Sequence, residues 1–221
     1  MKRVGLPLSL LIITLWSSDG RADQFDRPFA NWQAQRFHNA SKQRTDFTCG
    51  AASLSIIAQH YYSKEIAEAQ FTDTIRKMYT TEEWKDKRKN GLSLLDMKRA
   101  AEKFGFSTEG LKLTLDQLRQ LNGPIVVHLD KGFIQHFAVF KGVQGDRAYL
   151  ADPIFGNSRV PLYRFLNEWT GYALAIWIED QDLPAKNQLA VSPGETPNEW
   201  EAARDALYAR PLTNAFSPLA R

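Results

Sequence analysis

The segment Gln43-Arg-Thr-Asp-Phe-Thr-Cys49-Gly-Ala-Ala-Ser-Leu54 contains the lone cysteine of the 221-residue chain. Apolar residues recur every three or four positions between Gly50 and Tyr62, which predicts an amphipathic helix that begins directly after Cys49. The start of a helix has unpaired N–H groups and a positive dipole end, and both favour an anion such as a thiolate. The segment therefore indicates that Cys49 is a nucleophilic thiol. The alternative is that Cys49 is buried and acts only as a small hydrophobic side chain.

A thiol nucleophile needs a general base, and the base needs an orienting group. His136 opens an apolar strand at 137–143 and lies at a rim position from which its side chain can reach a cleft. Asp152 ends the next strand, because Pro153 stops it, and thus lies at the sheet end nearest His136. A turn-forming role before proline is the alternative for Asp152.

The other three histidines are weaker candidates for the base. His38 lies in a polar arm, His60 is far down the helix from Cys49, and His128 reads as a half-buried strand residue. Gln43 lies six residues before Cys49, and its carboxamide can donate a hydrogen bond to an oxyanion beside the N–H of Cys49. The four candidate residues are thus Cys49, His136, Asp152 and Gln43.

The periodicity changes from helical to extended along the chain. Besides the helix at 50–62, helical patterns cover 66–79, 94–104 and 114–121, with Ser93 and Thr114 as N-caps. Residues 125–129, 137–143, 148–150 and 172–178 are rich in β-branched and aromatic residues, which predicts strands. Helices followed by an antiparallel sheet define the α+β class.

Residues 144–147, Gln-Gly-Asp-Arg, predict a hairpin turn between two of these strands. The residue numbers 136 and 152 add up to an even number. His136 and Asp152 therefore lie on the same face of the hairpin only if the numbers of directly paired residues also add up to even numbers. A regular two-residue loop at 145–146 gives odd sums. We therefore expect a three-residue loop at 144–146 in the simplest case, or else a bulge in the ladder.

The first 22 residues carry the pattern of a secretory signal peptide. Met1-Lys2-Arg3 is basic, residues 4–16 are apolar, and small residues precede an expected cut after Ala22. A retained membrane anchor is the alternative, although the run is too short to span a bilayer comfortably. We expect a periplasmic protein with no stable membrane span, an N-terminal arm at 23–40, a peptidase domain at 41–180 and a polar tail at 181–221 with a short helix at 198–208.

The composition argues against nucleic-acid binding and against a metal site. The net charge of +3 comes without a long basic block interleaved with aromatic residues, so nucleic-acid binding is not expected. Cys and His do not have the spacing of a zinc site, so no metal or other cofactor is implied.

The segment 43–54 resembles the nucleophile segment of the C39 peptidases, the double-glycine leader peptidase family with a papain-like fold. His136-Phe-Ala-Val-Phe-Lys-Gly-Val and Arg147-Ala-Tyr-Leu-Ala-Asp152-Pro are similar to its His and Asp segments, and Phe165 and Trp169-Thr-Gly also fit. The resemblance covers about residues 41 to 178. It implies a cysteine peptidase with Cys49 as nucleophile, His136 as base, Asp152 as its orienter and Gln43 as oxyanion donor.

Two features depart from the family pattern. Thr48 precedes Cys49 where many members have Asp, and we expect no fused ATP-binding module. The chain is similar to the stand-alone exported branch, one group of which accompanies the Fap functional-amyloid export system of pseudomonads. The implied partners are a polypeptide substrate and, by that likeness, amyloid subunits or their export machinery. The alternatives are amidase or transglutaminase chemistry on the same residues and a non-cleaving module that binds an exported chain.

Overall fold

A computed structural model describes residues 36–45, 47–132, 134–182, 184 and 188–191. The expected signal peptide, most of the N-terminal arm and the helix expected at 198–208 lie outside the described residues. Within the described part of the chain, none of the helices is both long and apolar enough to cross a membrane. The elements in chain order are α2 (Cys49–His60), α3 (Glu68–Arg76), α4 (Thr81–Asn90), α5 (Leu94–Lys103), β1 (Ser107–Lys112), α6 (Leu115–Arg119), β2 (Ile125–Asp130), β3 (Gln135–Gln144), β4 (Arg147–Asp152), β5 (Gly156–Pro161), α7 (Leu162–Glu168) and β6 (Trp169–Trp177).

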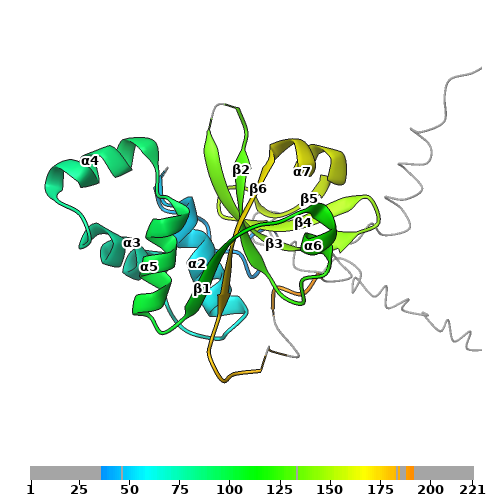
Figure 1. Cartoon of the computed structure of the whole chain (residues 1–221), viewed down its shortest axis with the longest axis horizontal. Helices are drawn as coiled ribbons and strands as arrows, with labels where there is room; N and C mark the ends of the chain where they lie inside the picture. The colour runs from blue at the N-terminus through cyan, green and yellow to red at the C-terminus, as the bar shows by residue number, and fades with distance from the viewer. Residues whose placement is uncertain (1–35, 46, 133, 183, 185–187, 192–221) are drawn as a thin grey trace, which may run out of the picture.

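The strands form one six-stranded sheet in the order β1-β6-β2-β3-β4-β5. Every neighbouring pair is antiparallel. Helices α2, α3 and α5 lie on one side of the sheet, and α6 and α7 lie on the other (Figure 1). The predicted α+β class, with N-terminal helices packed on an antiparallel sheet, is confirmed.

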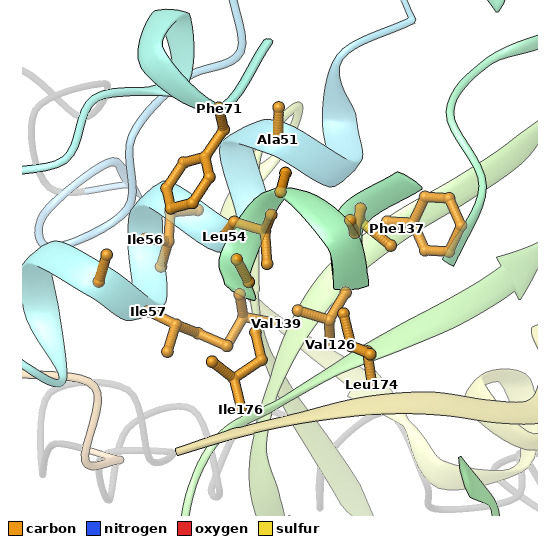
Figure 2. Packing of buried hydrophobic residues seen from close by; sticks show 14 of the residues in the cluster. Ala51, Leu54, Ile56, Ile57, Phe71, Val126, Phe137, Val139, Leu174 and Ile176 are labelled. Atoms are coloured by element: carbon orange, nitrogen blue, oxygen red, sulfur yellow. The ribbon is translucent and has the colours of Figure 1, made fainter. Parts of the chain in front are cut away.

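Residue alternation along the strands divides the interior into two cores. Val126 and Val139 belong to the core beneath α2, whereas their chain neighbours Val127 and Ala138 belong to the core on the opposite face. Figure 2 shows the first core, where Leu54 and Ile57 of α2 cluster with Val126, Val139 and Leu174 of the sheet. This burial fixes the direction of α2, and with it the position of its first residue, Cys49.

The helices and strands predicted between residues 50 and 178 are all present, with ends that differ by a few residues. Ser93 and Thr114 cap α5 and α6 as expected, since each hydroxyl accepts a hydrogen bond from the N–H three residues later. Helix α5 ends as predicted, and Gly105 follows with a φ of 80°, a conformation suited to glycine. Four further elements, α4, α7, β1 and β5, were not predicted.

The hairpin of β3 and β4 contains the bulge that the parity argument allowed. Gln144 pairs with Arg147 across a two-residue turn, so the simpler expectation of a three-residue loop was wrong. The register shifts between Phe140 and Gly142, which changes the sums of paired residues from odd to even. Beyond this shift Val139 pairs with Ala151, so the bulge puts His136 and Asp152 on the same face.

Candidate active site

Cys49 is the first residue of α2 and is only 7% exposed. Thr48 before it makes no side-chain cap to the helix, and its hydroxyl donates to the carboxylate of Glu68 at 2.5 Å. The N–H groups of Cys49 and the two residues after it have no acceptor within the helix. An anion held at this end of α2 would therefore meet free donors and the positive end of the helix dipole.

His136, near the start of β3, and Asp152, the last residue of β4, form a buried pair. Nε2 of His136 lies 3.0 Å from Oδ2 of Asp152, and each residue is 1% exposed. The other carboxylate oxygen of Asp152 accepts the backbone N–H groups of Ile154, at 2.7 Å, and Phe155, at 3.0 Å. The turn after β4 thus holds the carboxylate in one orientation, and the carboxylate in turn orients the imidazole.

Electrostatics favours the charged forms of both residues. Burial opposes the charge on His136, but hydrogen bonds with Asp152 and Cys49 outweigh it and raise the pKa of His136 to about 9. Burial likewise opposes the charge on Asp152, but the hydrogen bond from His136 and those from the backbone lower the pKa of Asp152 below its ordinary value. The pair is therefore an imidazolium and a carboxylate at neutral pH.

Cys49 lies close enough to His136 to help raise the pKa of the imidazole. Nδ1 of His136, the nitrogen that does not face Asp152, is buried and has no hydrogen-bond partner of normal geometry among the described residues. It is therefore the ring nitrogen left for the thiol. Hydrogen bonds between catalytic groups are often long when no substrate is bound.

Gln43 lies on the segment that leads into α2, beside the strand end that carries Asp152. Its backbone N–H donates to the carbonyl of Pro153 at 2.9 Å. Its Oε1 atom is buried and has no hydrogen-bond partner among the described residues. The structure thus joins the Gln43 segment to the turn that follows Asp152 and leaves the carboxamide oxygen unpartnered.

A groove of about 400 Å³ reaches Cys49 from the surface. Strand residues His128 and Phe137 line it on one side, and the C-terminal end of α4 and the turn after it line it on the other. Its lining also includes Phe47, Leu92 and Ile134. The buried thiol is therefore accessible along a groove lined by both apolar and polar side chains.

The profile of the Peptidase C39 family matches residues 38–181. The chain belongs to the Peptidase C39 family. The probable functional amyloid protease FapD of Pseudomonas fluorescens is 34% identical over 148 residues, which are 67% of this chain and 64% of that protein. The chain thus spans slightly less than two thirds of the length of that relative. The prediction of a C39-type fold and family is confirmed.

Two solved C39 structures resemble the chain. The peptidase domain of Streptococcus ComA, a bifunctional ABC transporter, superposes with a TM-score of 0.55 at 26% identity and covers 64% of this chain and 99% of that domain. A double glycine motif protease from an AMS/PCAT transporter, solved with its leader peptide, has a TM-score of 0.52 at 26% identity, over 63% of this chain and 90% of that one.

One residue of this C39 peptidase that sequence reasoning missed is Glu68, the first residue of α3. It is 8% exposed, and its carboxylate accepts the backbone N–H of Arg44 at 3.1 Å as well as the hydroxyl of Thr48. Glu68 thus holds both ends of the segment between Gln43 and Cys49. Glu68 contacts Thr48 across 20 positions of the chain, and no local sequence pattern signals such a contact.

The remaining histidines of this peptidase lie apart from the Cys49–His136 pair or bond elsewhere. Nδ1 of His60 lies 2.8 Å from the carboxamide oxygen of Gln188. Nδ1 of His128 lies 3.0 Å from the hydroxyl of Thr170, and burial lowers the pKa of His128, so its ring is neutral. His128 lines the groove but bonds to β6, which agrees with its interpretation as a half-buried strand residue.

Proposed function

We propose that this chain is an exported cysteine peptidase that hydrolyses a peptide bond in a secreted or periplasmic polypeptide. The observation that carries the proposal is the buried His136, which bonds to Asp152 through one nitrogen and leaves the other for Cys49. An oriented base beside a thiol at a helix start is the arrangement that activates cysteine for acyl transfer.

The reaction begins from a Cys49 thiolate and a His136 imidazolium. The thiolate attacks the scissile carbonyl carbon, and the oxyanion that forms is stabilised by the free N–H groups at the start of α2 and by the carboxamide of Gln43. His136 gives its proton to the leaving amine as the C–N bond breaks, which leaves a thioester on Cys49. A water then attacks the thioester and gives a proton to His136. The Cys49 thiolate leaves as the C–S bond breaks, which restores the thiolate–imidazolium pair, and the acid product ionises to a carboxylate in solvent.

Asp152 acts on this reaction through His136. Its carboxylate fixes the ring so that Nδ1 serves Cys49, and it stabilises the imidazolium that the first step uses. Glu68 acts further away, because it holds the segment that carries Gln43 and ends at Cys49.

The N-terminal pattern and the relatives support the proposed place of action and the proposed substrate. The basic, apolar and small-residue series of residues 1–22 supports export to the periplasm. The similarity to a probable functional amyloid protease supports a substrate among amyloid subunits or their export machinery.

Comparative mass spectrometry of exported proteins tests the function. Cells that export the wild-type chain should contain new peptide termini that are absent from cells with Cys49→Ala, produced at equal level. A thiol-directed suicide reagent should also label Cys49 much faster than it labels free cysteine. Identical termini in both cells, together with ordinary thiol reactivity, would show a binding module that does not cleave.

A further inference from the structure

His128 lies on the wall of the groove that leads to Cys49. The ring is half-buried, and Phe137, its directly paired neighbour across β2 and β3, lines the groove beside it. Strand alternation puts His128 on the same face as Val126, which belongs to the core beneath α2. Burial and then the charge on His136 lower the pKa of His128, so the two rings lie near each other. The mechanism uses only His136 and leaves His128 without a role in the site.

Thr170 of β6 contacts both the backbone and the ring of His128. Its hydroxyl donates to the backbone carbonyl of His128 at 3.1 Å, and because that carbonyl can only accept, the single hydroxyl proton is used there. The hydroxyl oxygen accepts the backbone N–H of Tyr172 at 3.4 Å and lies 3.0 Å from Nδ1 of His128. Nδ1 must therefore carry a proton and donate it to Thr170.

The ring of His128 consequently has one free acceptor. Because burial lowers the pKa of His128, the ring is neutral at neutral pH and carries its one proton at Nδ1. Nε2 then has a lone pair, and it makes no hydrogen bond with any residue that the structure describes. The tilted contact with Phe137, with ring centroids 4.9 Å apart, helps to hold the plane of the ring. Nε2 is thus left to accept a hydrogen bond from a ligand in the groove.

A polypeptide in the groove supplies the donor that this atom needs. Its backbone N–H groups leave water when it binds, and a buried N–H without an acceptor costs free energy. Carbonyl and carboxylate oxygens cannot bond to Nε2, because two lone pairs would face each other. The chemistry of the ring therefore matches a backbone N–H and excludes the backbone carbonyl.

We propose that Nε2 of His128 accepts a backbone N–H of the polypeptide bound beside Cys49. The proposal rests on the proposed function, because it assigns a substrate-binding residue of the same site. Thr170 is then a positioning residue, since it holds the ring in the tautomer that accepts. Proline has no N–H, so the substrate cannot have proline at the position that meets His128.

The tautomer can be tested without a ligand. Nitrogen-15 NMR of wild-type, full-length protein labelled in its histidines distinguishes protonated from unprotonated ring nitrogens, and His128→Phe identifies the signals of His128 by their loss. At neutral pH, Nδ1 of His128 should be protonated and Nε2 unprotonated. A proton on Nε2, alone or together with one on Nδ1, would overturn the proposal.

Binding tests the contact itself and does not depend on cleavage. Full-length protein with Cys49→Ala is titrated into dye-labelled peptides with a Gly-Gly centre and flanking leucines, in which an ester replaces one backbone amide at a time. Each ester has an oxygen in place of the N–H. At one position the ester should bind roughly 3- to 10-fold more weakly than the parent peptide, because one hydrogen bond is lost. With His128→Phe added, which keeps a ring but has no nitrogen, this difference should disappear.

Matched variants separate substrate binding from a structural role. Thr170→Ser keeps the hydroxyl and should retain the difference between amide and ester, whereas Thr170→Val, which has no hydroxyl, should reduce it. His60→Phe removes a histidine that bonds to Gln188 and does not line the groove, so it should change nothing.

Three binding results would overturn the proposal: a parent peptide that does not bind, no position that is sensitive to the ester, or a difference that persists in His128→Phe. The last result, with a lower unfolding free energy of His128→Phe, would show that His128 only joins β2 to β6. A failure of the proposed function would show separately, as a wild-type protein that cleaves neither exported proteins nor peptides.

Discussion

Cys49, His136 and Asp152 are each less than a tenth exposed, whereas α4, which forms the other wall of the same groove, buries none of its ten residues. The first group is fixed by the core: α2 packs on the sheet, and hydrogen bonds inside the protein hold His136 and Asp152. The second is held by one aromatic contact and one network, in which Lys87 bonds to the buried Asp96. Groups that perform chemistry need fixed geometry, whereas the end of α4 lines the groove with exposed side chains. Substitutions in the two regions should therefore differ in their effects on cleavage and on stability.

The largest effect is expected for Cys49→Ala, which removes the nucleophile from one end of α2. Cleavage should fall by at least about 10³-fold, because no other group can form the acyl-enzyme. Ser55→Ala is the matched control on the same helix, since it deletes a hydroxyl that donates to the carbonyl of Ile66 at 2.9 Å. It should cost about 1 kcal/mol of unfolding free energy and leave cleavage unchanged. Peptidase assays and denaturant unfolding measure both; retained cleavage in Cys49→Ala would exclude Cys49 as nucleophile.

The next effect is expected for Asp152→Asn, which keeps the shape of the side chain and removes its charge. Cleavage should fall by about 10²- to 10⁴-fold, because His136 loses its orientation and the stabilisation of its imidazolium. In wild type, kcat/KM should decline as pH rises past about 9, where the imidazolium loses its proton. In the variant this decline should move to lower pH. A variant with an unchanged pH profile would remove Asp152 from the role of orienting group.

Stability should depend on pH through the same buried pair. The pKa of His136 is raised from 6.5 to about 9 on folding, so its contribution is complete below pH 6.5 and is lost as pH rises toward 9. The loss should be on the order of 3 kcal/mol. Denaturant unfolding of wild type and of His136→Gln at pH 6 and pH 9 measures it, and the variant should lack most of the change. Equal pH dependence in both proteins would contradict a charged pair in the folded state.

The smallest effects are expected on α4, where two lysines make ion pairs of different kinds. Lys87 contacts the buried carboxylate of Asp96, so Lys87→Met should destabilise the protein by about 1–3 kcal/mol. Lys85 contacts the exposed Glu82, so Lys85→Met should change stability by less than about 1 kcal/mol. Thermal unfolding of the two variants compares them directly, and a larger loss for Lys85→Met would mean that the Asp96 network does not hold α4.

The elements that sequence reasoning predicted are those that bury a regular apolar pattern. Helix α2 and strands β2 and β3 pack in the interior, and their periodicity shows it. Strands β1 and β5 are the two edges of the sheet, and their sequences, Ser107-Thr-Glu-Gly-Leu-Lys and Gly156-Asn-Ser-Arg-Val-Pro, are too polar for an apolar strand pattern. Helix α4 was missed because it has no apolar face, although its capping box of Thr80 and Glu83 was a readable signal.

The candidate site was predictable where its residues are close to marked elements of the sequence. Cys49 lies at the start of a predicted helix, and His136 and Asp152 lie at the ends of predicted strands. From these positions the sequence alone predicted that the three residues lie close together. Parity required a bulge or an odd loop, but nothing in the sequence identified the position after Phe140 as the place of the register shift. The positions of Glu68 and of helix α4 depend on contacts between segments distant in the chain, which periodicity does not report.

The pH dependence of Cys49 alkylation tests the central claim most directly, because Cys49 is the lone cysteine of the chain. If Cys49 and His136 form an ion pair, alkylation of wild type should stay fast down to mildly acidic pH. In His136→Gln the rate should instead rise with pH as it does for a free thiol, whose pKa is about 8.5. Near-ultraviolet circular dichroism confirms that the variant is folded. Two superimposable curves, both those of an ordinary thiol, would contradict the pairing of Cys49 with His136 and the mechanism built on it.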